Sequence, residues 1–370
     1  MQVILIFTYG VSLKDWNESG LLDREILIYK ELIKKYNIKF TFLTYGTDED
    51  EKLITENNIS IIPIYKIVKR SKFKYLNYIK SIFITFKLRK YLENIDLIKT
   101  NQLNGAWLGI ILKYLLKKPL YVRTGYNIHE FKLLQNSRFY IILFYKYLTK
   151  LAYFSCDIFS ITSQVDKDKI ALITQNSAKL KVIKNFVPNV SEKDNKKRIS
   201  DRLFSVGRLE SQKNYTSIIK ILKNSAFGID VVGSGTLKNE LINISEKNGV
   251  SLNLIENLNN SDLLKLYKKY KYFILNSDYE GNPKVVIEAL ANGCVVICKD
   301  NLNVRELIIN NKNGFLYKNE DEILKIIKKL DNNKDLYEQI VIEGLKTIKN
   351  EHLLEIILKK EIEIYNKLTF

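Results

Sequence analysis

The chain has 370 residues, of which 46% are hydrophobic and 27% charged, and its formal net charge is +18. This composition excludes a disordered protein, and the length favours two domains of ordinary size. Three cysteines exclude a disulfide framework, and no uninterrupted apolar run reaches the ~20 residues that cross a bilayer. The first residues lack the features of a signal peptide. We therefore expect a cytoplasmic protein, free or peripherally attached to the inner face of the cytoplasmic membrane.

The positive charge is concentrated in the first half of the chain. Residues 1–200 contain 34 Lys and Arg against 18 Asp and Glu, a net +16. Residues 201–370 contain 25 against 23, a net +2. This asymmetry predicts an anionic surface, either membrane or nucleic acid, near the first half.

Short apolar runs alternate with helical periodicity through the first half of the chain. Leu22, Ile26, Tyr29 and Ile33 recur at spacings of four, three and four, which predicts a helix over Leu21–Tyr36. Near-continuous apolar runs are typical of parallel strands that are covered on both faces. The predicted strands are Gln2–Thr8, Ile38–Tyr45, Ile59–Tyr65, Asp96–Asn101, Leu120–Gly125, Asp157–Thr162 and Leu180–Phe186.

The same alternation restarts after a polar stretch, Asn189–Asp201, which has the composition of a linker. We therefore predict an α/β chain with one doubly wound domain over 1–188 and another over 189–350. A last helix within 351–370 is expected to return to the first domain. The elements predicted for the second domain are strands Leu203–Val206, Ile229–Val232, Ser251–Ile255, Tyr272–Leu275 and Cys294–Cys298, and helices Thr216–Leu222, Leu237–Lys247 and Asp262–Tyr267.

The most informative segment is Asn276–Val296, which reads NSDYEGNPKVVIEALANGCVV. It predicts a strand, a loop bearing Glu280 and a helix that begins near Asn282, with Pro283 in the first turn. Free backbone N–H groups and the positive end of the helix dipole attract an anion at such a start. Glu288 follows within the helix. Two acceptor carboxylates around an anion site suit a ligand with phosphates in its middle and hydroxyl-rich sugars at both ends, as in a nucleotide sugar.

This segment resembles the signature of the family-4-type retaining glycosyltransferases (glycosyl transferases group 1). That family has the GT-B fold, in which two Rossmann-like domains face each other across a cleft. The resemblance implies metal-independent transfer of a sugar from a nucleotide-sugar donor, with no cofactor, to a glycan or lipid-linked acceptor. It points to the assembly of cell-surface polysaccharide or lipooligosaccharide. The matching residues are Ser277, Glu280, Gly281, Pro283, Glu288, Ala289, Ala291 and Gly293.

A second segment, Val206–Asn214, resembles the family's G-R-L-x-x-x-K-N stretch. The resemblance implies that Arg208 and Lys213 contact the donor diphosphate, the first as a fork of donors and the second as a point charge. With Glu280, which would hold the hydroxyls of the donor sugar, they are the candidate catalytic residues. Glu288 would hold the ribose hydroxyls. The further candidates for donor binding are Gly281, Asn282, Pro283, Lys284, Gly233, Gly235, Leu258 and Gly10.

The first half resembles the family less specifically. Thr100–Gly105 and Pro119–Glu130 are similar to a subset of enzymes from surface-polysaccharide gene sets. Many relatives place a histidine at the end of the strand Leu120–Gly125, whereas here a histidine, His129, follows four residues later. The candidates for contact with sugar or acceptor are Arg123, Tyr126 and His129.

Three other residues have structural interpretations. Cys294 and Cys298 are predicted to be core residues, because no further metal ligands lie near them. His352, which precedes the last helix, is predicted to be a helix cap or a surface residue.

The segment Tyr65–Lys90 contains nine Lys and Arg, six aromatic residues and no acid. Aromatic and cationic residues mixed on helices suit an anionic membrane surface, which we expect at Lys66–Lys90. A solvated basic helix face is the other interpretation. Nucleic-acid binding is disfavoured, because the chain has none of the common recognition modules.

Two other functions fit parts of this pattern. A GT-B nucleotide-sugar epimerase or a glucan synthase would share the architecture, and acceptor dependence would separate the epimerase from a transferase. A non-catalytic, basic membrane or nucleic-acid binding protein with a decayed fold is the alternative from another class. The presence of all four candidate residues argues against a decayed active site; they are Glu280, Glu288, Arg208 and Lys213.

Overall fold

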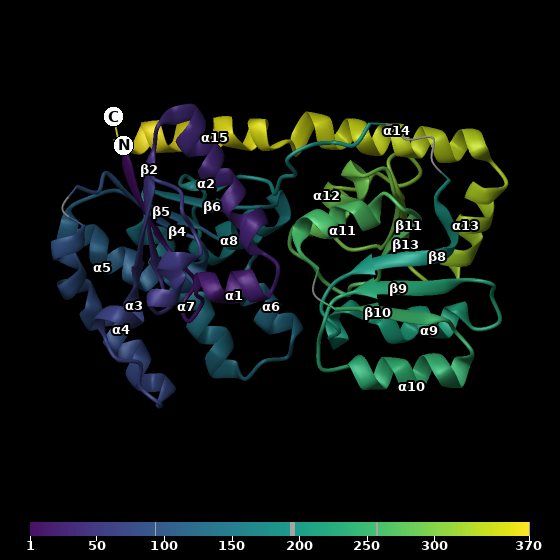
Figure 1. Cartoon of the computed structure of the whole chain (residues 1–370), viewed down its shortest axis with the longest axis horizontal. Coiled ribbons are helices and arrows are strands. Elements are labelled where there is room, and N and C mark those ends of the chain that lie inside the picture. The colour runs from purple at the N-terminus through teal and green to yellow at the C-terminus, as the bar shows by residue number, and fades with distance from the viewer. Residues whose placement is uncertain (93, 193–196, 257, 370) are drawn as a thin grey trace. The chain divides into compact units, whose positions relative to one another are not determined.

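The computed structural model describes residues 1–92, 94–192, 197–256 and 258–369. The chain forms two compact units (Figure 1). Unit 1 comprises Met1–Ile183 and the chain from Leu358 on, and unit 2 comprises Lys184–Ile357. The boundary predicted from the sequence, at residue 188, falls a few residues later.

Unit 1 is built on a seven-stranded sheet in the order β3-β2-β1-β4-β5-β6-β7, and all its pairings are parallel. The order reverses between β1 and β4, so the loops that follow these two strands turn away to opposite sides, as in doubly wound folds that bind ligands there. The strands are β1 (Gln2–Ile6), β2 (Lys39–Thr44), β3 (Ile59–Pro63), β4 (Leu97–Thr100), β5 (Leu120–Arg123), β6 (Ile158–Ile161) and β7 (Leu180–Val182).

The helices of unit 1 cover this sheet, and α5 packs against both α4 and α7. The helix predicted over Leu21–Tyr36 is α2. The helices are α1 (Leu13–Glu18), α2 (Leu22–Tyr36), α3 (Ile64–Ile67), α4 (Lys74–Leu88), α5 (Ala106–Leu116), α6 (Ile128–Leu134), α7 (Phe139–Ser155) and α8 (Gln164–Thr174).

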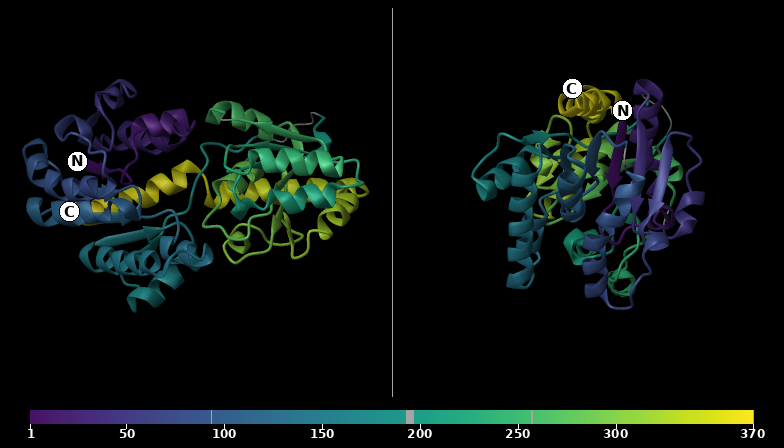
Figure 2. Two further views of the ribbon diagram at one scale, coloured as in Figure 1. Left: turned by 90° about the horizontal axis from the view of Figure 1, so that it is seen from below. Right: turned by 90° about the vertical axis from the view of Figure 1, so that its left-hand side faces the viewer.

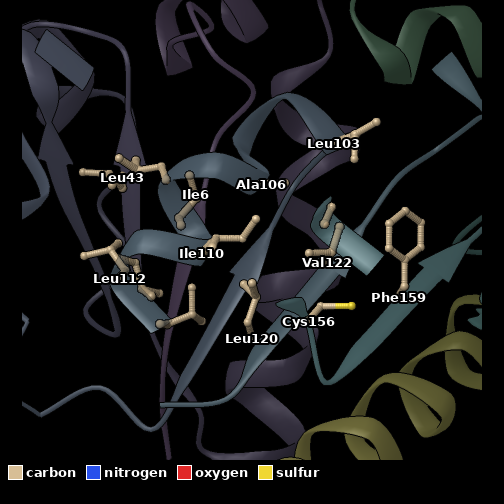
Figure 3. Packing of buried hydrophobic residues seen from close by; sticks show 14 of the residues in the cluster. Ile6, Leu43, Leu103, Ala106, Ile110, Leu112, Leu120, Val122, Cys156 and Phe159 are labelled. Atoms are coloured by element: carbon tan, nitrogen blue, oxygen red, sulfur yellow. The ribbon is translucent and has the colours of Figure 1, made fainter. Parts of the chain in front are cut away.

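The core of unit 1 forms because its strands are apolar on both faces. Figure 3 shows Ile6 of β1, Val122 of β5 and Phe159 of β6 in one cluster with Ala106 and Ile110 of α5. Four of these five side chains are fully buried, and Ile110 is nearly so. The near-continuous apolar runs of the sequence therefore correspond to a parallel sheet buried on both sides.

Unit 2 repeats this plan with six parallel strands in the order β10-β9-β8-β11-β12-β13. The sequence did not predict β13, which has only three residues. The strands are β8 (Ile199–Val206), β9 (Gly228–Val232), β10 (Leu252–Ile255), β11 (Tyr270–Leu275), β12 (Val295–Lys299) and β13 (Phe315–Tyr317). The helices are α9 (Tyr215–Leu222), α10 (Lys238–Asn248), α11 (Asn260–Tyr267), α12 (Lys284–Ala291), α13 (Glu322–Asp331), α14 (Lys334–Glu351) and α15 (Leu354–Thr369), whose residues from Leu358 on belong to unit 1.

Both faces of the second sheet are buried, as the side chains of β12 show. Val295 and Ile297 belong to one hydrophobic cluster and Val296 and Cys298 to another, because successive side chains of a strand point to opposite faces. Helices lie on either side of the sheet (Figure 2). Cys294 and Cys298 are free, buried core residues, which confirms the prediction for them.

A buried ion pair fixes the end of the chain to unit 1. Nζ of Lys99, in β4, lies 2.7 Å from Oε2 of Glu361 in α15, and both side chains are only 1% exposed. Lys99 also donates to the Tyr365 hydroxyl at 3.0 Å. Burial lowers the pKa of Lys99, while Glu361 opposes that change. Because neither charge reaches water, each depends on the other for compensation.

Among the described residues, no helix is both long enough and apolar enough to cross a membrane.

Candidate active site

The strand order of unit 2 reverses between β8 and β11, and the candidate site lies at the carboxyl ends of these strands. After β8 the chain passes through Gly207 and Arg208 to the 3₁₀ turn Ser211–Lys213, and Asn214 then enters α9 in the left-handed conformation with φ 46°. Asn tolerates this conformation better than most residues. The loop thus turns back, so that Lys213 lies near the carboxyl end of β8.

The loop after β11 is held against the loop after β8 by hydrogen bonds. Nε2 of Gln212 donates to the Tyr279 carbonyl at 2.7 Å, and the Asp278 amide donates to the Gln212 carbonyl at 3.1 Å. Nδ2 of Asn276 donates to the Asn214 carbonyl at 2.9 Å. The two loops that carry the candidate catalytic residues therefore form one fixed assembly at the reversal point.

This assembly brings Lys213 and Glu280 together. Nζ of Lys213 lies 2.5 Å from Oε1 of Glu280, and the two side chains are 12% and 10% exposed. The lysine stem runs over Gly207, where an added Cβ would lie 2.9 Å from Cε of Lys213. The sequence predicts both residues for the donor site, and the structure places their charges in contact.

Arg208 is the exposed cation of the site. Its side chain has no hydrogen bond or ion pair with any residue that the structure describes. A guanidinium that the fold does not use, in the same loop as Lys213, is free to take a phosphate through two parallel N–H groups.

Gly233 and Gly235 allow the loop after β9 to pack directly on the loop after β8. A Cβ on Gly233 would lie 2.0 Å from the Gly207 carbonyl oxygen, and one on Gly235 would lie 2.4 Å from that of Leu209. Gly233 also has a φ of 153°, which favours glycine. The close packing of the two loops therefore explains why glycine occurs at both positions. Contact with a ligand stays a prediction.

Helix α12 begins at Lys284, two residues after the predicted start near Asn282. Pro283 is its N-cap and so precedes the first turn in which the sequence placed it. Gly281 is buried and Lys284 is half-buried. Glu280 thus lies four residues before the helix, on the approach to its N-terminal amides.

The side chain of Asn282 is the least satisfied polar group of the site. It is 6% exposed, and neither Nδ2 nor Oδ1 hydrogen-bonds to a described residue. Its main chain is fixed, because Nδ2 of Asn185 donates to the Asn282 carbonyl at 2.7 Å. Buried amides rarely lack partners, so this side chain indicates a place where a ligand supplies them.

Glu288 is buried in α12, about one turn from its start at Lys284, with 3% of its surface exposed. The Tyr267 hydroxyl donates to its Oε2 at 3.1 Å. Sequence reasoning missed Tyr267, which comes from α11 and belongs to no motif. The assignment of Glu288 to ribose stays a prediction.

Two donor candidates remain, Leu258 and Gly10. Leu258 is half-buried against the unit 2 core, and its neighbour Asn257 lies outside the described residues. Gly10 belongs to unit 1, where it is exposed after β1 with a φ of 77°.

The candidates of the first half lie at the carboxyl edge of the unit 1 sheet. Oε1 of Gln102 accepts a hydrogen bond from the Gly125 amide at 2.8 Å, which joins the two segments that resemble surface-polysaccharide enzymes. The ring of Tyr126 packs on Phe131, with centroids 4.5 Å apart. His129 is half-buried in α6.

Arg123 and His129 differ in their surroundings. Nη1 of Arg123 donates to the Asn101 carbonyl at 3.4 Å. Burial works against its charge, but Tyr29 and Glu361 leave the pKa of Arg123 raised. Burial lowers the pKa of His129, with Lys146 acting in the same sense and Glu130 opposing. Tyr29 and Glu361 therefore favour the charged form of Arg123, whereas burial favours the neutral form of His129.

Sequence reasoning missed an aromatic cluster at the same edge. The rings of Tyr9 and Tyr78 stack with centroids 3.9 Å apart, and Trp107 and Tyr45 lie 5.5 and 4.9 Å from Tyr9. Burial raises the pKa of Tyr9 to about 12, so its hydroxyl stays protonated. Tyr9 comes three residues after β1 and Tyr45 directly after the neighbouring β2, which was the available signal.

His352 is a C-cap, as one of the two predictions for it states, but it is fully buried and not a surface residue. Its Nδ1 lies 2.8 Å from the Asn185 carbonyl oxygen. Among the residues that the structure describes, no group of three or more His, Cys, Asp or Glu side chains is placed to hold a metal ion.

Comparison with known proteins decides the family. Residues 186–347, which make up most of unit 2, match the family Glycosyl transferases group 1. Unit 2 belongs to this family. The resemblance drawn from its motifs is thereby confirmed, and the chain is a glycosyltransferase.

Similar proteins extend this conclusion over the whole chain. An uncharacterized glycosyltransferase of Haemophilus influenzae is 24% identical over 347 residues, which cover 90% of this chain and 92% of that protein. The Escherichia coli enzyme UDP-Gal:alpha-D-GlcNAc-diphosphoundecaprenol alpha-1,3-galactosyltransferase is 26% identical over 319 residues, or 71% of this chain and 80% of that enzyme. The crystal structure of Anabaena HepE in complex with UDP has a TM-score of 0.76 at 15% identity, with 100% of both chains covered. This likeness confirms the GT-B fold of two Rossmann-like domains for the glycosyltransferase.

Proposed function

We propose that this glycosyltransferase moves a sugar from a nucleoside diphosphate sugar to a lipid-linked or glycan acceptor, with retention of anomeric configuration and without a metal ion. Assembly of a cell-surface polysaccharide or lipooligosaccharide is the process that this reaction serves. A uridine nucleotide is the first donor to test, because HepE was crystallised with UDP and the Escherichia coli relative is named for UDP-Gal.

The donor would lie at the carboxyl edge of the unit 2 sheet. Arg208 and Lys213 would take the diphosphate, and the start of α12 would add backbone N–H groups. Glu280 would accept hydrogen bonds from sugar hydroxyls, and the unsatisfied amide of Asn282 would meet the same part of the donor. Glu288 would hold the ribose, for which its bond to Tyr267 would fix one carboxylate oxygen.

Two cations at one edge are the reason to propose transfer without a metal. The charge that develops on a departing diphosphate must be neutralised, and preorganised donors do this without reorganisation during the reaction. Lys213 is already fixed by Glu280, and Arg208 is uncommitted. The test is transfer in the presence of EDTA, which should leave the rate unchanged.

The transfer step needs no nucleophile from the protein. The bond between the sugar C1 and the phosphate oxygen breaks, and a bond between C1 and the acceptor oxygen forms on the same face of the ring. The acceptor hydroxyl gives its proton to the departing phosphate oxygen, and the nucleoside diphosphate leaves. Arg208 and Lys213 would stabilise that oxygen as its charge grows.

The observation that carries this proposal is the 2.5 Å Lys213–Glu280 pair between the two loops of the reversal point. The experiment is a thermal-shift screen of UDP, GDP, CMP and ADP sugars, followed by a transfer assay with the donor that binds. A donor at about 100 times its Kd should stabilise the protein by ~2.7 kcal/mol. Donor consumption that requires no acceptor would favour an epimerase and contradict transfer. No shift with any donor would favour the non-catalytic alternative.

The basic segment supports a site of action at the cytoplasmic face of a membrane. Lys69, Arg70, Lys72, Lys87 and Lys90 are exposed. Each exposed cation near an anionic surface adds about 1 kcal/mol of attraction. Flotation with anionic vesicles should weaken when Lys69, Arg70 and Lys72 are changed to Glu, and unchanged flotation would contradict this contact.

A single-site comparison within the segment is Lys66→Glu against Lys69→Glu. Lys66 belongs to the same segment, but its Nζ is already paired with Glu51 at 2.8 Å. A single reversal there should weaken flotation less than a reversal at Lys69.

A further inference from the structure

Helix α7 carries an unbroken apolar stripe on its outer surface. Tyr140, Phe144, Tyr147, Leu151 and Phe154 recur at spacings of four, three, four and three, so they share one face of the helix. Each of these five side chains is between 51% and 65% exposed. The opposite face is occupied, because Leu148, Thr149, Ala152 and Tyr153 are buried against unit 1.

The stripe has cations beside it and no acid near it in the sequence. No Asp or Glu occurs between Glu130 and Asp157. Lys146 and Lys150 are half-buried. Long lysine stems lie along apolar surface while their charged ends stay in water. A shallow hollow in this face is lined by Phe144, Tyr147, Leu148, Lys150, Leu151 and Phe154.

Helix α4 has the same character. Leu76, Ile79, Phe83 and Phe86 are exposed over about three turns of the helix, and its fifteen residues contain no acid. α4 and α7 pack on the same helix, α5, whose Tyr114 is 68% exposed. Both helices reach the lower part of unit 1 as it is drawn in Figure 1.

We propose that α7, together with α4, lies in the headgroup region of a membrane that contains anionic lipids, with the apolar stripe of α7 inserted below the headgroups. Single exposed hydrophobic residues are ordinary, but contiguous stripes on two helices mark an interaction surface. Aromatic and aliphatic side chains on one face with lysines beside them are typical of helices in the membrane interface. The core of a protein–protein interface is depleted in lysine, so charge favours the lipid surface as the occupant.

The position of these helices fits the proposed acceptor. Tyr145 of α7 accepts a hydrogen bond from Nδ2 of Asn104 at 3.5 Å, and Tyr78 of α4 stacks on Tyr9. Tyr9 and Asn104 follow β1 and β4, so both helices meet the carboxyl edge of the unit 1 sheet. A lipid-linked acceptor in the bound membrane would lie beside this edge. Only this last step rests on the proposed function, because membrane binding is measured without donor or acceptor.

The test compares two double variants in vesicle flotation. Phe144→Ser/Leu151→Ser removes two residues of the stripe, which are 51% and 52% exposed. Ile309→Ser/Ile342→Ser is the matched control, because these residues of unit 2 are 56% and 48% exposed. With phosphatidylcholine vesicles that contain phosphatidylglycerol, the stripe variant should bind about tenfold more weakly than wild type, since two half-exposed large side chains no longer insert. The control should bind like wild type.

Other outcomes would overturn the proposal. Equal binding by wild type and the stripe variant, or equal losses in both variants, would do so. A stripe variant that binds vesicles normally but differs from wild type in oligomeric state in solution would make this face a contact between copies of the chain. Circular dichroism of both variants checks folding, and transfer to a water-soluble acceptor should be unchanged. The transfer measurement distinguishes a failure of the membrane proposal from a failure of the proposed reaction.

Discussion

Each unit contains a lysine–glutamate pair with little solvent exposure, and the two pairs lie in different kinds of place. In unit 1, Lys99 and Glu361 meet at 2.7 Å beneath the sheet, with 1% of each side chain exposed. In unit 2, Lys213 and Glu280 meet at 2.5 Å in the loops beyond the sheet, with 12% and 10% exposed. The same chemical pair is thus enclosed in one unit and presented at an edge in the other.

This difference distinguishes an ion pair that stabilises the fold from an ion pair that is placed at the candidate active site. A fully enclosed pair is already compensated, and it joins the last helix to the sheet of its unit. A pair at the reversal point of the strand order lies where doubly wound sheets bind ligands. Its neighbours Arg208 and Asn282 have polar atoms that the described structure leaves unused. We therefore expect removal of the first pair to change stability, and removal of the second to change activity.

The largest effect is expected from Lys99→Met. It leaves the Glu361 carboxylate buried without its cation, which should cost about 3–5 kcal/mol of unfolding free energy. The double variant Lys99→Met/Glu361→Leu should regain much of that loss, because no buried charge remains. Denaturant unfolding measures both, and donor binding by the folded protein should be unchanged. Loss of donor affinity in folded Lys99→Met would contradict the purely structural role assigned to the Lys99–Glu361 pair.

The next effect is expected from Lys213→Met. Removing one preorganised donor to a developing charge costs roughly 10²–10³ in kcat, or about 2.7–4 kcal/mol of transition-state stabilisation. Unfolding free energy should change much less than in Lys99→Met, because both side chains of the pair reach solvent. The measurement is kcat for transfer beside a melting curve. A variant that transfers normally but melts early would make this pair structural.

The smallest effect is expected from protonation of His129. Its pKa in the folded protein is lowered by burial, so the unfolded state takes up the proton first as pH falls below about 6.5. Stability should therefore be unaffected by His129 above that pH and decline slightly below it. Proton NMR titration, with His129→Asn to assign the signal, should give a midpoint below 6.5. A midpoint above 6.5 would place a carboxylate in control of the ring.

Much of the fold follows from local pattern in the sequence. Apolar runs such as Gln2–Ile6 mark buried parallel strands, and the motif with Glu280 and Glu288 marks the loop and helix of the candidate site. Short β13 escaped prediction because three residues carry no periodicity. The stripe on α7 was open to prediction, since its four-three-four-three spacing is visible in the sequence.

The contacts that complete the sites were not open to prediction from the sequence. Tyr267 reaches Glu288 from another helix, and Tyr78 reaches Tyr9 across 69 positions of the chain. Neither pair shares a motif or a periodicity. Such pairings depend on how the elements pack, and local pattern does not fix that packing.

The central claim is that the carboxyl edge of the unit 2 sheet binds the donor diphosphate. Calorimetric titration with the nucleoside diphosphate found in the donor screen tests it most directly, with wild type, Arg208→Gln and Lys269→Gln compared. Lys269 is an exposed cation directly before β11, at the opposite edge of the same sheet. We expect Arg208→Gln to weaken binding roughly 10- to 100-fold, as the loss of a charge-assisted hydrogen bond does, and Lys269→Gln to bind like wild type. Equal affinities for all three proteins would contradict the claim.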